Sequence, residues 1–262
     1  MFNLEINVKT PYSDDEVKNN IIASKRYPYV VRGYNRQPAA VVGGAPSILE
    51  HLDELKNWPD EIYAINDTAG WLSELGIVNY LVSVDMTPKV FRQGNLIRGA
   101  FFATRCSPAQ FIYDNIHVFT TVADDEKYGI GGGTSTACVM VHLCGYLGHR
   151  KTYLFGCDGS YKNDFNISST ADFAYQNMFI VRSGGRDFIT NPNMFLQSQY
   201  LSECCRKYPN LIVNKSNGLL RSMIKWEKWE VVAVSEQMKN GFEQIEDTGR
   251  FKKKYQTIGL GA

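Results

Sequence analysis

The sequence has little net charge and no long apolar run. Its 262 residues carry 28 lysines and arginines against 27 aspartates and glutamates, for a formal net charge of +1. This balance gives no bulk electrostatic reason to bind nucleic acid. No stretch approaches the roughly 18 consecutive apolar residues of a membrane-spanning helix, and the N-terminal residues do not resemble a targeting signal. We therefore expect a cytoplasmic protein.

Several catalytic signatures are also missing. The sequence contains no Walker A motif, no HExxH motif and no Gly-x-Ser-x-Gly elbow. The six cysteines show no metal-site spacing, and in a chain of this size we expect them to be reduced. The four histidines fall on unrelated segments, so zinc chemistry is not expected. His142 lies in an apolar segment and is expected to be a buried structural histidine.

Short apolar segments alternate with helix-like segments through most of the chain. This alternation predicts parallel βαβ units, which have right-handed crossovers. The predicted fold class is α/β, a Rossmann-like and mostly parallel sheet with helices on both faces. Strands are expected at residues 39–42, 62–65, 80–84, 99–103, 117–121, 152–155 and 211–213, and helices at residues 47–56, 68–75, 135–147 and 193–207.

Three regions follow from this pattern. Residues 1–36 are expected to be a lead-in that packs on the core, and residues 37–224 to form the Rossmann-like domain. Within that domain, residues 160–190 interrupt the alternation of predicted strands and helices and indicate a lid, an acceptor loop or an irregular connection. Residues 225–262 are charged and predict either a peripheral helical arm, which includes the option of a homo-oligomer contact, or a solvated tail.

Two glycines end the first predicted strand. Gly43 and Gly44 precede Pro46 and Ser47, at the point where the next helix begins. A glycine turn that opens a helix lets backbone N–H groups and the helix dipole face a phosphate. The same pattern also serves as a tight strand-to-helix turn, and this stretch alone does not separate the two interpretations.

A second glycine turn precedes the helix expected at residues 135–147. Gly132 and Gly133 belong to a run of three glycines, followed by Thr134 and Ser135. Such a run has a high conformational cost on folding, which is easier to understand if the backbone lies against a ligand. Two glycine turns in one sheet, each of which could bind an anion, favour a nucleotide-binding site.

Polar residues follow three other predicted strands. Asn66 and Asp67 follow the second strand, Asp85 the third, and Asp158 and Tyr161 the sixth. In open α/β sheets, ligands bind beyond the carboxyl ends of the strands. Each residue has a simpler interpretation as a helix cap or a turn residue. Asp158 is the leading candidate for acid–base or metal chemistry.

Four stretches together resemble a known superfamily. They are "VVGGAPSILEHLDEL", "IYAINDTAGWLSELGIVNYLVSVDMTP", "GGGTSTACVMVHLCGYLG" and "KTYLFGCDGSY". The superfamily comprises the bacterial motility accessory factor glycosyltransferases, the related bacterial sialyltransferases and the archaeal 6-hydroxymethylpterin diphosphokinases. The shared order covers residues 39–161. The matching positions are Gly43-Gly44-Ala45-Pro46-Ser47-Ile48, Asn66, Asp85, Ser135, Leu147-Gly148 and Gly156-Cys157-Asp158.

The resemblance implies a glycosyltransferase-like enzyme that uses a nucleotide-activated sugar, such as a CMP-sugar, and an acceptor glycan, protein or small alcohol. The first glycine turn would face the donor phosphate, Asn66 the ribose or base, and the second turn the other side of the donor. Asp158 would be the general base, with Asp85 and Tyr161 close by. The nucleotide-binding set is Gly43, Gly44, Ser47, Asn66, Asp67, Gly132, Gly133, Thr134 and Ser135.

The resemblance leaves two alternatives. One is a diphosphokinase that uses ATP and Mg²⁺, with the metal held by Asp85 and Asp158. The other is a catalytically inactive nucleotide-binding module. The sequence departs from the family pattern at Ala45, where relatives carry glycine, and it lacks a histidine after Asp158, where the sialyltransferases carry their catalytic base.

Overall fold

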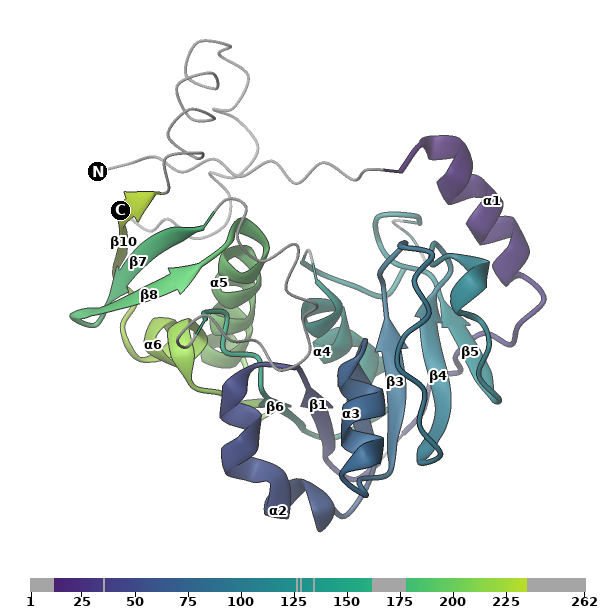
Figure 1. Cartoon of the computed structure of the whole chain (residues 1–262), viewed down its shortest axis with the longest axis horizontal. Coiled ribbons are helices and arrows are strands. Elements are labelled where there is room, and N and C mark those ends of the chain that lie inside the picture. The colour runs from purple at the N-terminus through teal and green to yellow at the C-terminus, as the bar shows by residue number, and fades with distance from the viewer. Residues whose placement is uncertain are drawn as a thin grey trace.

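The computed structural model describes residues 12–34, 36–125, 127, 129–133, 135–161 and 178–234. Their main feature is a seven-stranded parallel sheet with the order β5-β4-β3-β2-β1-β6-β9 (Figure 1). This confirms the predicted α/β class. The strands are β1 (Ala39–Val42), β2 (Ile62–Ile65), β3 (Asn79–Ser83), β4 (Ile97–Ala103), β5 (Ile116–Phe119), β6 (Thr152–Phe155) and β9 (Ile212–Asn214).

Helices cover both faces of this sheet. Helices α2 (Leu52–Lys56) and α3 (Thr68–Glu74) lie in the connections that lead from β1 to β2 and on to β3. Helices α4 (Thr136–Tyr146) and α5 (Pro192–Lys207) lie in connections that run across the sheet in the opposite direction, to β6 and then to β9. Right-handed crossovers place the two sets on opposite faces. The contact between α4 and α5 agrees with this arrangement.

The helix expected at residues 47–56 has two parts. A 3-10 helix, η1 (Pro46–His51), comes first and α2 follows it. No side chain caps η1, although proline stands at its start. The N–H of Ser47 is instead bound by a side chain from a distant strand, as described below. The first turn is therefore fixed by tertiary contact and not by a local cap.

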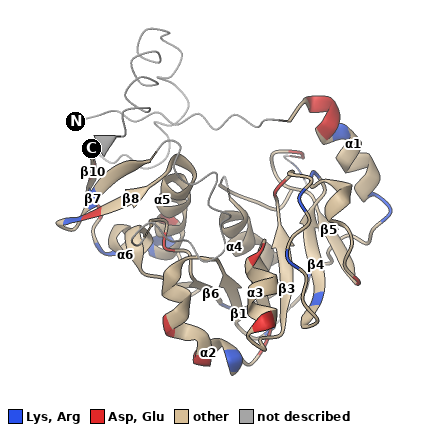
Figure 2. Ribbon diagram, in the orientation of Figure 1, with Lys and Arg blue, Asp and Glu red and all other residues tan. Residues whose placement is uncertain are grey.

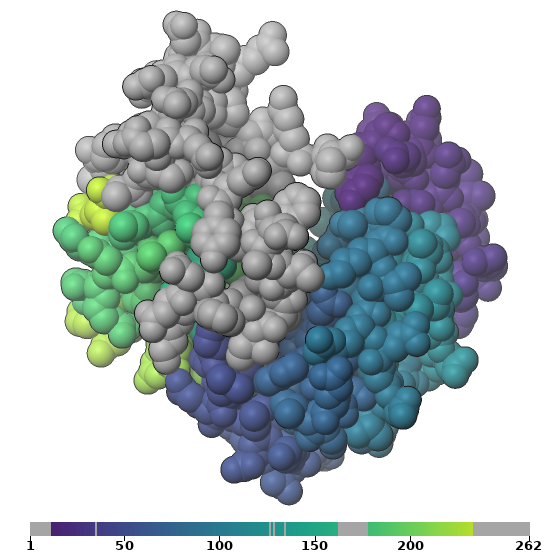
Figure 3. All heavy atoms as spheres, viewed as in Figure 1, coloured from purple at the N-terminus to yellow at the C-terminus, as the bar shows by residue number. Residues whose placement is uncertain are grey.

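A second, antiparallel sheet has the order β10-β7-β8 and lies at one end of the molecule (Figures 1 and 3). Its strands are β7 (Phe179–Ser183), β8 (Arg186–Thr190) and β10 (Trp229–Val234), and α6 (Gly218–Lys225) packs on β7. Apolar side chains from this sheet, α5 and α6 form a separate small core.

The second sheet corrects one sequence-based expectation and gives the structure of part of another predicted region. Part of the C-terminal arm, predicted to be helical, is the strand β10, because a segment rich in valine, which favours strands, pairs antiparallel with β7. Part of the predicted lid is the hairpin β7–β8. The rest of both predictions falls on residues 162–177 and 235–262, which lie outside the described residues.

The lead-in packs on the main domain and contains a helix that its weak periodicity did not indicate. Helix α1 (Asp14–Ser24) begins with a capping box formed by Ser13 and Glu16, and it contacts η2 (Pro108–Gln110). Its first turn is acidic, which suits the helix dipole (Figure 2). Further on, residues 28–30 run beside β5, where the Val30 N–H donates to the Val118 carbonyl at 2.9 Å.

All six cysteines lie in the described part of the chain, and none forms a disulfide, as the sequence suggested. Five of them are buried. Among the described residues, no helix has the length and apolar character needed to cross a membrane.

Candidate functional site

The sheet reverses its strand order beside β1. The chain passes from β1 through β2 to β5 on one side, and then returns to add β6 on the other side of β1. In open α/β sheets, the crevice outside the carboxyl ends of the strands at such a switch point is the usual ligand site. The ends of β1, β6 and β2 and the start of α4 are therefore the candidate site.

Two glycines hold the ends of β1 and β6 together. A Cβ atom added to Gly43 would lie 2.5 Å from the Gly156 carbonyl oxygen, and Gly156 has a φ of +58°. The Gly43 N–H donates to the Phe155 carbonyl at 2.8 Å. The need for glycine at position 43 thus comes from the close approach of two strand ends. Gly44, the next residue, is half-buried.

Asp158 connects three elements at this edge of the sheet. Its carboxylate, which is 5% exposed, accepts hydrogen bonds from the Ser47 N–H at 3.2 Å, from the Ser47 hydroxyl and from the Asn217 N–H at 3.1 Å. These contacts fasten η1, which follows β1, and the start of α6 to the end of β6. Burial raises the pKa of Asp158, and the hydrogen bonds from Ser47 and Asn217 offset this only in part.

These contacts occupy both hydrogen-bond donors of Ser47. Its N–H and hydroxyl both donate to Asp158, so neither is directed at a donor phosphate. A phosphate placed there would also meet the carboxylate of Asp158. The same contacts favour a positioning role for Asp158, while its raised pKa is a property that general acids and bases share. Its predicted catalytic role stays a prediction.

Asn66 follows β2, the strand beside β1. It adopts a left-handed conformation with a φ of +52°, and its carboxamide oxygen is buried with no hydrogen-bond partner among the described residues. An unpaired buried acceptor costs about 1–3 kcal/mol, and in native structures it calls for an explanation. A ligand hydroxyl or amino group would supply the missing donor.

Asp67 faces a neighbouring loop instead. Its carboxylate accepts from the Lys89 ammonium and, at 3.0 Å, from the Arg92 N–H. Both carboxylate oxygens therefore hold the connection between β3 and β4. These contacts give Asp67 a structural role beside the crevice.

The second glycine turn packs against α4 and α5. Gly132 and Gly133 have φ values of +151° and +71°, and a Cβ atom on Gly132 would overlap the hydroxyl of Tyr200. Ser135 caps α4 by accepting from the Cys138 N–H at 3.3 Å. Thr134, predicted to bind phosphate, lies outside the described residues.

The start of α4 reaches the carboxyl edge of the sheet. Its Thr136 hydroxyl accepts from the Val84 N–H, just after β3, at 3.3 Å. The 11-residue helix therefore directs its N-terminal end, which carries a partial positive charge, at the edge where the strands end.

His142 is exposed, so the expectation of a buried structural histidine was wrong. Its Nε2 atom lies 2.6 Å from the hydroxyl of Tyr200 on α5, and the Gly132 turn covers the pair. Although the residue as a whole is exposed, Tyr200 and the Gly132 turn shield part of its imidazole from water, and this desolvation lowers the pKa of His142. Burial of the phenol raises the pKa of Tyr200. The sequence gives no signal for this pair, because its members are 58 residues apart.

The other two predicted catalytic residues lie further from the crevice. Asp85 accepts from the Thr87 N–H and hydroxyl at 2.9 and 2.6 Å, a local turn after β3. Three strand spacings, roughly 14 Å, separate β3 from β6, so Asp85 and Asp158 follow strands that are not neighbours in the sheet. Tyr161 pairs with Ile189 of β8, and its hydroxyl accepts from Asn191 at 2.6 Å.

A different cluster of ionisable groups lies at the amino ends of the strands. Glu61 contacts His149 at 3.0 Å and Arg36 at 2.7 Å, and Asp60 lies close by. Burial of Glu61 raises its pKa, but the hydrogen bonds from His149 and Tyr63 and the charge of Arg36 lower it to about 2. Because a guanidinium already neutralises it, we interpret this cluster as a structural ion-pair network.

No family model and no curated protein matches this sequence. Among solved structures, the fold is similar to that of the MAf glycosyltransferase from Magnetospirillum magneticum AMB-1, with a TM-score of 0.57 and 13% sequence identity. The match covers 89% of this chain and 41% of that chain, so this chain spans less than half the length of that protein. At this identity, the likeness concerns the fold.

Proposed function

We propose that this chain is a glycosyltransferase-like enzyme that binds a nucleotide-activated sugar at the switch point of its sheet. The observation that carries the proposal is the buried, unpaired carboxamide oxygen of Asn66 beside β1. A nucleotide offers ribose hydroxyls and base amino groups, which are the donors that this oxygen lacks. The fold similarity to a glycosyltransferase supports the transferase class.

The donor phosphates would lie at the start of α4. There the helix dipole favours an anion, and Ser135 fixes the first turn. The start of η1 is a poorer phosphate site, because Asp158 occupies its N–H group and brings negative charge. Gly43 and Gly44 would then shape the floor of the crevice without binding the phosphate.

The pair of His142 and Tyr200 would supply acid–base catalysis. The lowered pKa of His142 favours the neutral imidazole, as a general base requires. This histidine comes from α4 and not from the segment after Asp158, where the sialyltransferases carry theirs. His142→Gln should lower kcat by about 10²–10⁴-fold and leave donor affinity unchanged.

Donor binding tests the proposal directly. The thermal stability of the protein should rise with one of CMP, UDP, GDP or ATP, and Asn66→Ala should abolish that shift. Thr87→Ala is a suitable control, because the Thr87 hydroxyl is already engaged by Asp85 and Tyr12. If no nucleotide changes the melting temperature at millimolar concentrations, the proposal is wrong.

The same experiment separates the alternatives. A shift that requires both ATP and Mg²⁺ would favour the diphosphokinase. A nucleotide shift without turnover of any nucleotide sugar, tested with glycan, peptide and small-alcohol acceptors, would favour an inactive binding module.

A further inference from the structure

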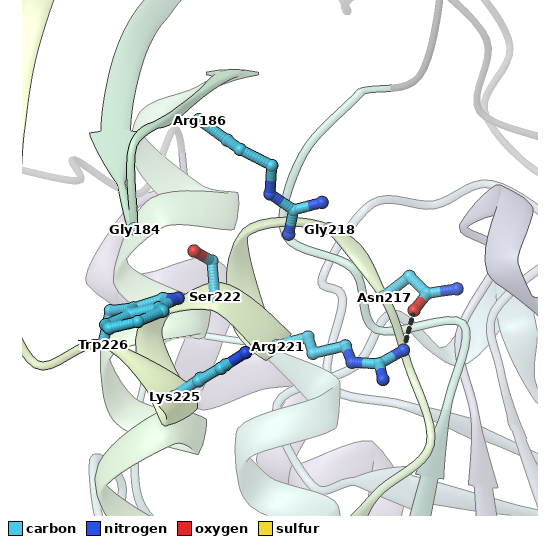
Figure 4. A pocket seen from close by; sticks show the side chains of 8 residues that line it. All are labelled: Gly184, Arg186, Asn217, Gly218, Arg221, Ser222, Lys225 and Trp226. Atoms are coloured by element: carbon cyan, nitrogen blue, oxygen red, sulfur yellow. Dashed lines mark hydrogen bonds between the residues drawn. The ribbon is translucent and has the colours of Figure 1, made fainter.

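A hollow lies between α6 and the turn of the β7–β8 hairpin. Its cavity volume is about 570 Å³, within the range of small-molecule sites. It is lined by Gly184, Arg186, Asn217, Gly218, Arg221, Ser222, Lys225 and Trp226 (Figure 4). Three of these residues are cationic and none is acidic.

The cations come from two elements and meet at one opening. Arg186 extends from β8 towards Gly218, while Arg221 and Lys225 extend from α6 (Figure 4). In the described part of the chain, none of the three forms an ion pair with a carboxylate. Asp187, next to Arg186, is held by Arg182 at 2.7 Å. The positive charge of the hollow is therefore not neutralised from within.

The hollow is built on ordered contacts. The Ser222 hydroxyl donates to the Ser183 carbonyl at 3.0 Å and fastens α6 to β7. The Asn217 side chain accepts from Arg221 at 2.7 Å and orients its guanidinium (Figure 4). Such contacts reduce the entropy that a ligand must overcome when it binds.

Trp226 gives the hollow an apolar wall. Its indole is 49% exposed and lies against Gly184, and the Lys225 ammonium stands 5.1 Å from the centre of its ring. An exposed indole beside unpaired cations is suited to a ligand that has both a flat apolar part and an anionic part.

The N-terminus of α6 does not supply the anion-binding groups. The N–H groups of Asn217, Leu219 and Leu220 donate to Asp158 and Ser160 at the end of β6. The side chains thus carry the charge, while the start of the helix ties the hollow to the candidate donor site. Two arginines favour a phosphate over a single carboxylate, because guanidinium forks bind its oxygens in a bidentate manner.

We propose that this hollow binds a phosphate-bearing small molecule, with the phosphate held by Arg186, Arg221 and Lys225 and the adjoining part of the ligand against Trp226. The proposal does not rest on the proposed glycosyl transfer, because Arg186, Arg221, Lys225 and Trp226 take no part in the switch-point crevice, although the start of α6 connects the two sites. Failure of either proposal therefore leaves the other standing.

Inorganic pyrophosphate is the first probe. Titration at 50 mM KCl should give saturable binding by calorimetry and a change in tryptophan fluorescence that Trp226→Phe removes. Arg186→Gln and Arg221→Gln should each weaken binding by about tenfold or more, and 300 mM KCl should weaken it further. All three positions are exposed, so these variants should fold, as circular dichroism will verify.

Two control variants test whether pyrophosphate binds at the hollow. Arg98→Gln removes an exposed arginine on β4 of the main sheet that has no carboxylate partner among the described residues, and it should leave the affinity unchanged. Ser135→Ala alters the candidate donor site and should also leave pyrophosphate binding at the hollow unchanged. The proposal is overturned if wild-type protein shows no saturable binding at millimolar pyrophosphate, or if both arginine variants bind like wild type.

Discussion

Asp158→Asn tests whether this side chain positions the site or carries out the chemistry. Three donors, the N–H and hydroxyl of Ser47 and the N–H of Asn217, converge on its carboxylate. The asparagine would keep one acceptor oxygen and would turn an NH₂ group towards another donor. At least one hydrogen bond to a charged group would be lost, worth about 1.5–3 kcal/mol, and a buried N–H would be left unsatisfied.

These losses are partly offset, because the uncharged asparagine escapes the burial penalty that raises the pKa of Asp158. The expected net cost is about 3 kcal/mol of unfolding free energy. For a domain of this size, about 2–4 °C of melting temperature corresponds to 1 kcal/mol. The Tm should therefore fall by roughly 6–12 °C. Calorimetry or circular dichroism on purified variants measures this shift.

Ser47→Ala removes only the hydroxyl donor and should cost about 1.5–3 kcal/mol, because this bond too goes to a charged group. Asp85→Asn is the matched aspartate control, since its two bonds to Thr87 belong to a half-buried local turn, and its Tm should fall less than that of Asp158→Asn. The positioning role is refuted if Asp158→Asn keeps the wild-type Tm but loses all turnover. That result would identify Asp158 as the general base.

Two further substitutions probe other parts of the fold. The pKa of Glu61 is about 2 in the folded protein against 4.5 ordinarily, so its carboxylate stabilises the fold above about pH 4.5 and this contribution is lost as the pH falls towards 2. After allowance for partial exposure, the contribution of this carboxylate to stability is about 1–2 kcal/mol. Glu61→Gln should therefore reduce the difference in urea midpoint between pH 6 and pH 3. An unchanged difference would contradict this prediction. Gly132→Ala should lower the Tm and disturb the pair of His142 and Tyr200. Gly145→Ala is the control on α4, where an added Cβ atom meets open space, and it should raise the Tm slightly. Equal Tm values for the two variants would contradict the packing of the glycine turn.

The main sheet could be predicted because its strands are short and buried on both faces. Residues 39–42 are all apolar and fully buried, and the predicted bounds of this strand match those observed. The smaller sheet could not be predicted in this way. Strands β7 and β10 are about 50 residues apart in the chain, and their side chains alternate between a small core and solvent.

The candidate site was only partly accessible from the sequence. Strand ends and glycine turns indicated where the crevice lies, because the carboxyl ends of parallel strands share one edge. The sequence could not indicate which polar groups are already engaged. Ser47 and Asp158 stand 111 residues apart, and their contact exists only in the folded chain. The cations Arg186, Arg221 and Lys225 were likewise missed, because they converge from β8 and α6.

The segment that runs beside β5 also affects how this protein can associate. β5 is an outer strand of the main sheet, but Val118 at its centre exchanges hydrogen bonds with Pro28 and Val30. The opposite outer strand, β9, has three residues. Exposed strand edges are the usual templates for cross-β pairing between molecules. With one edge covered and the other short, the main sheet offers little template for intermolecular strand addition, which leaves the outer strands β8 and β10 of the smaller sheet as the strand edges to consider.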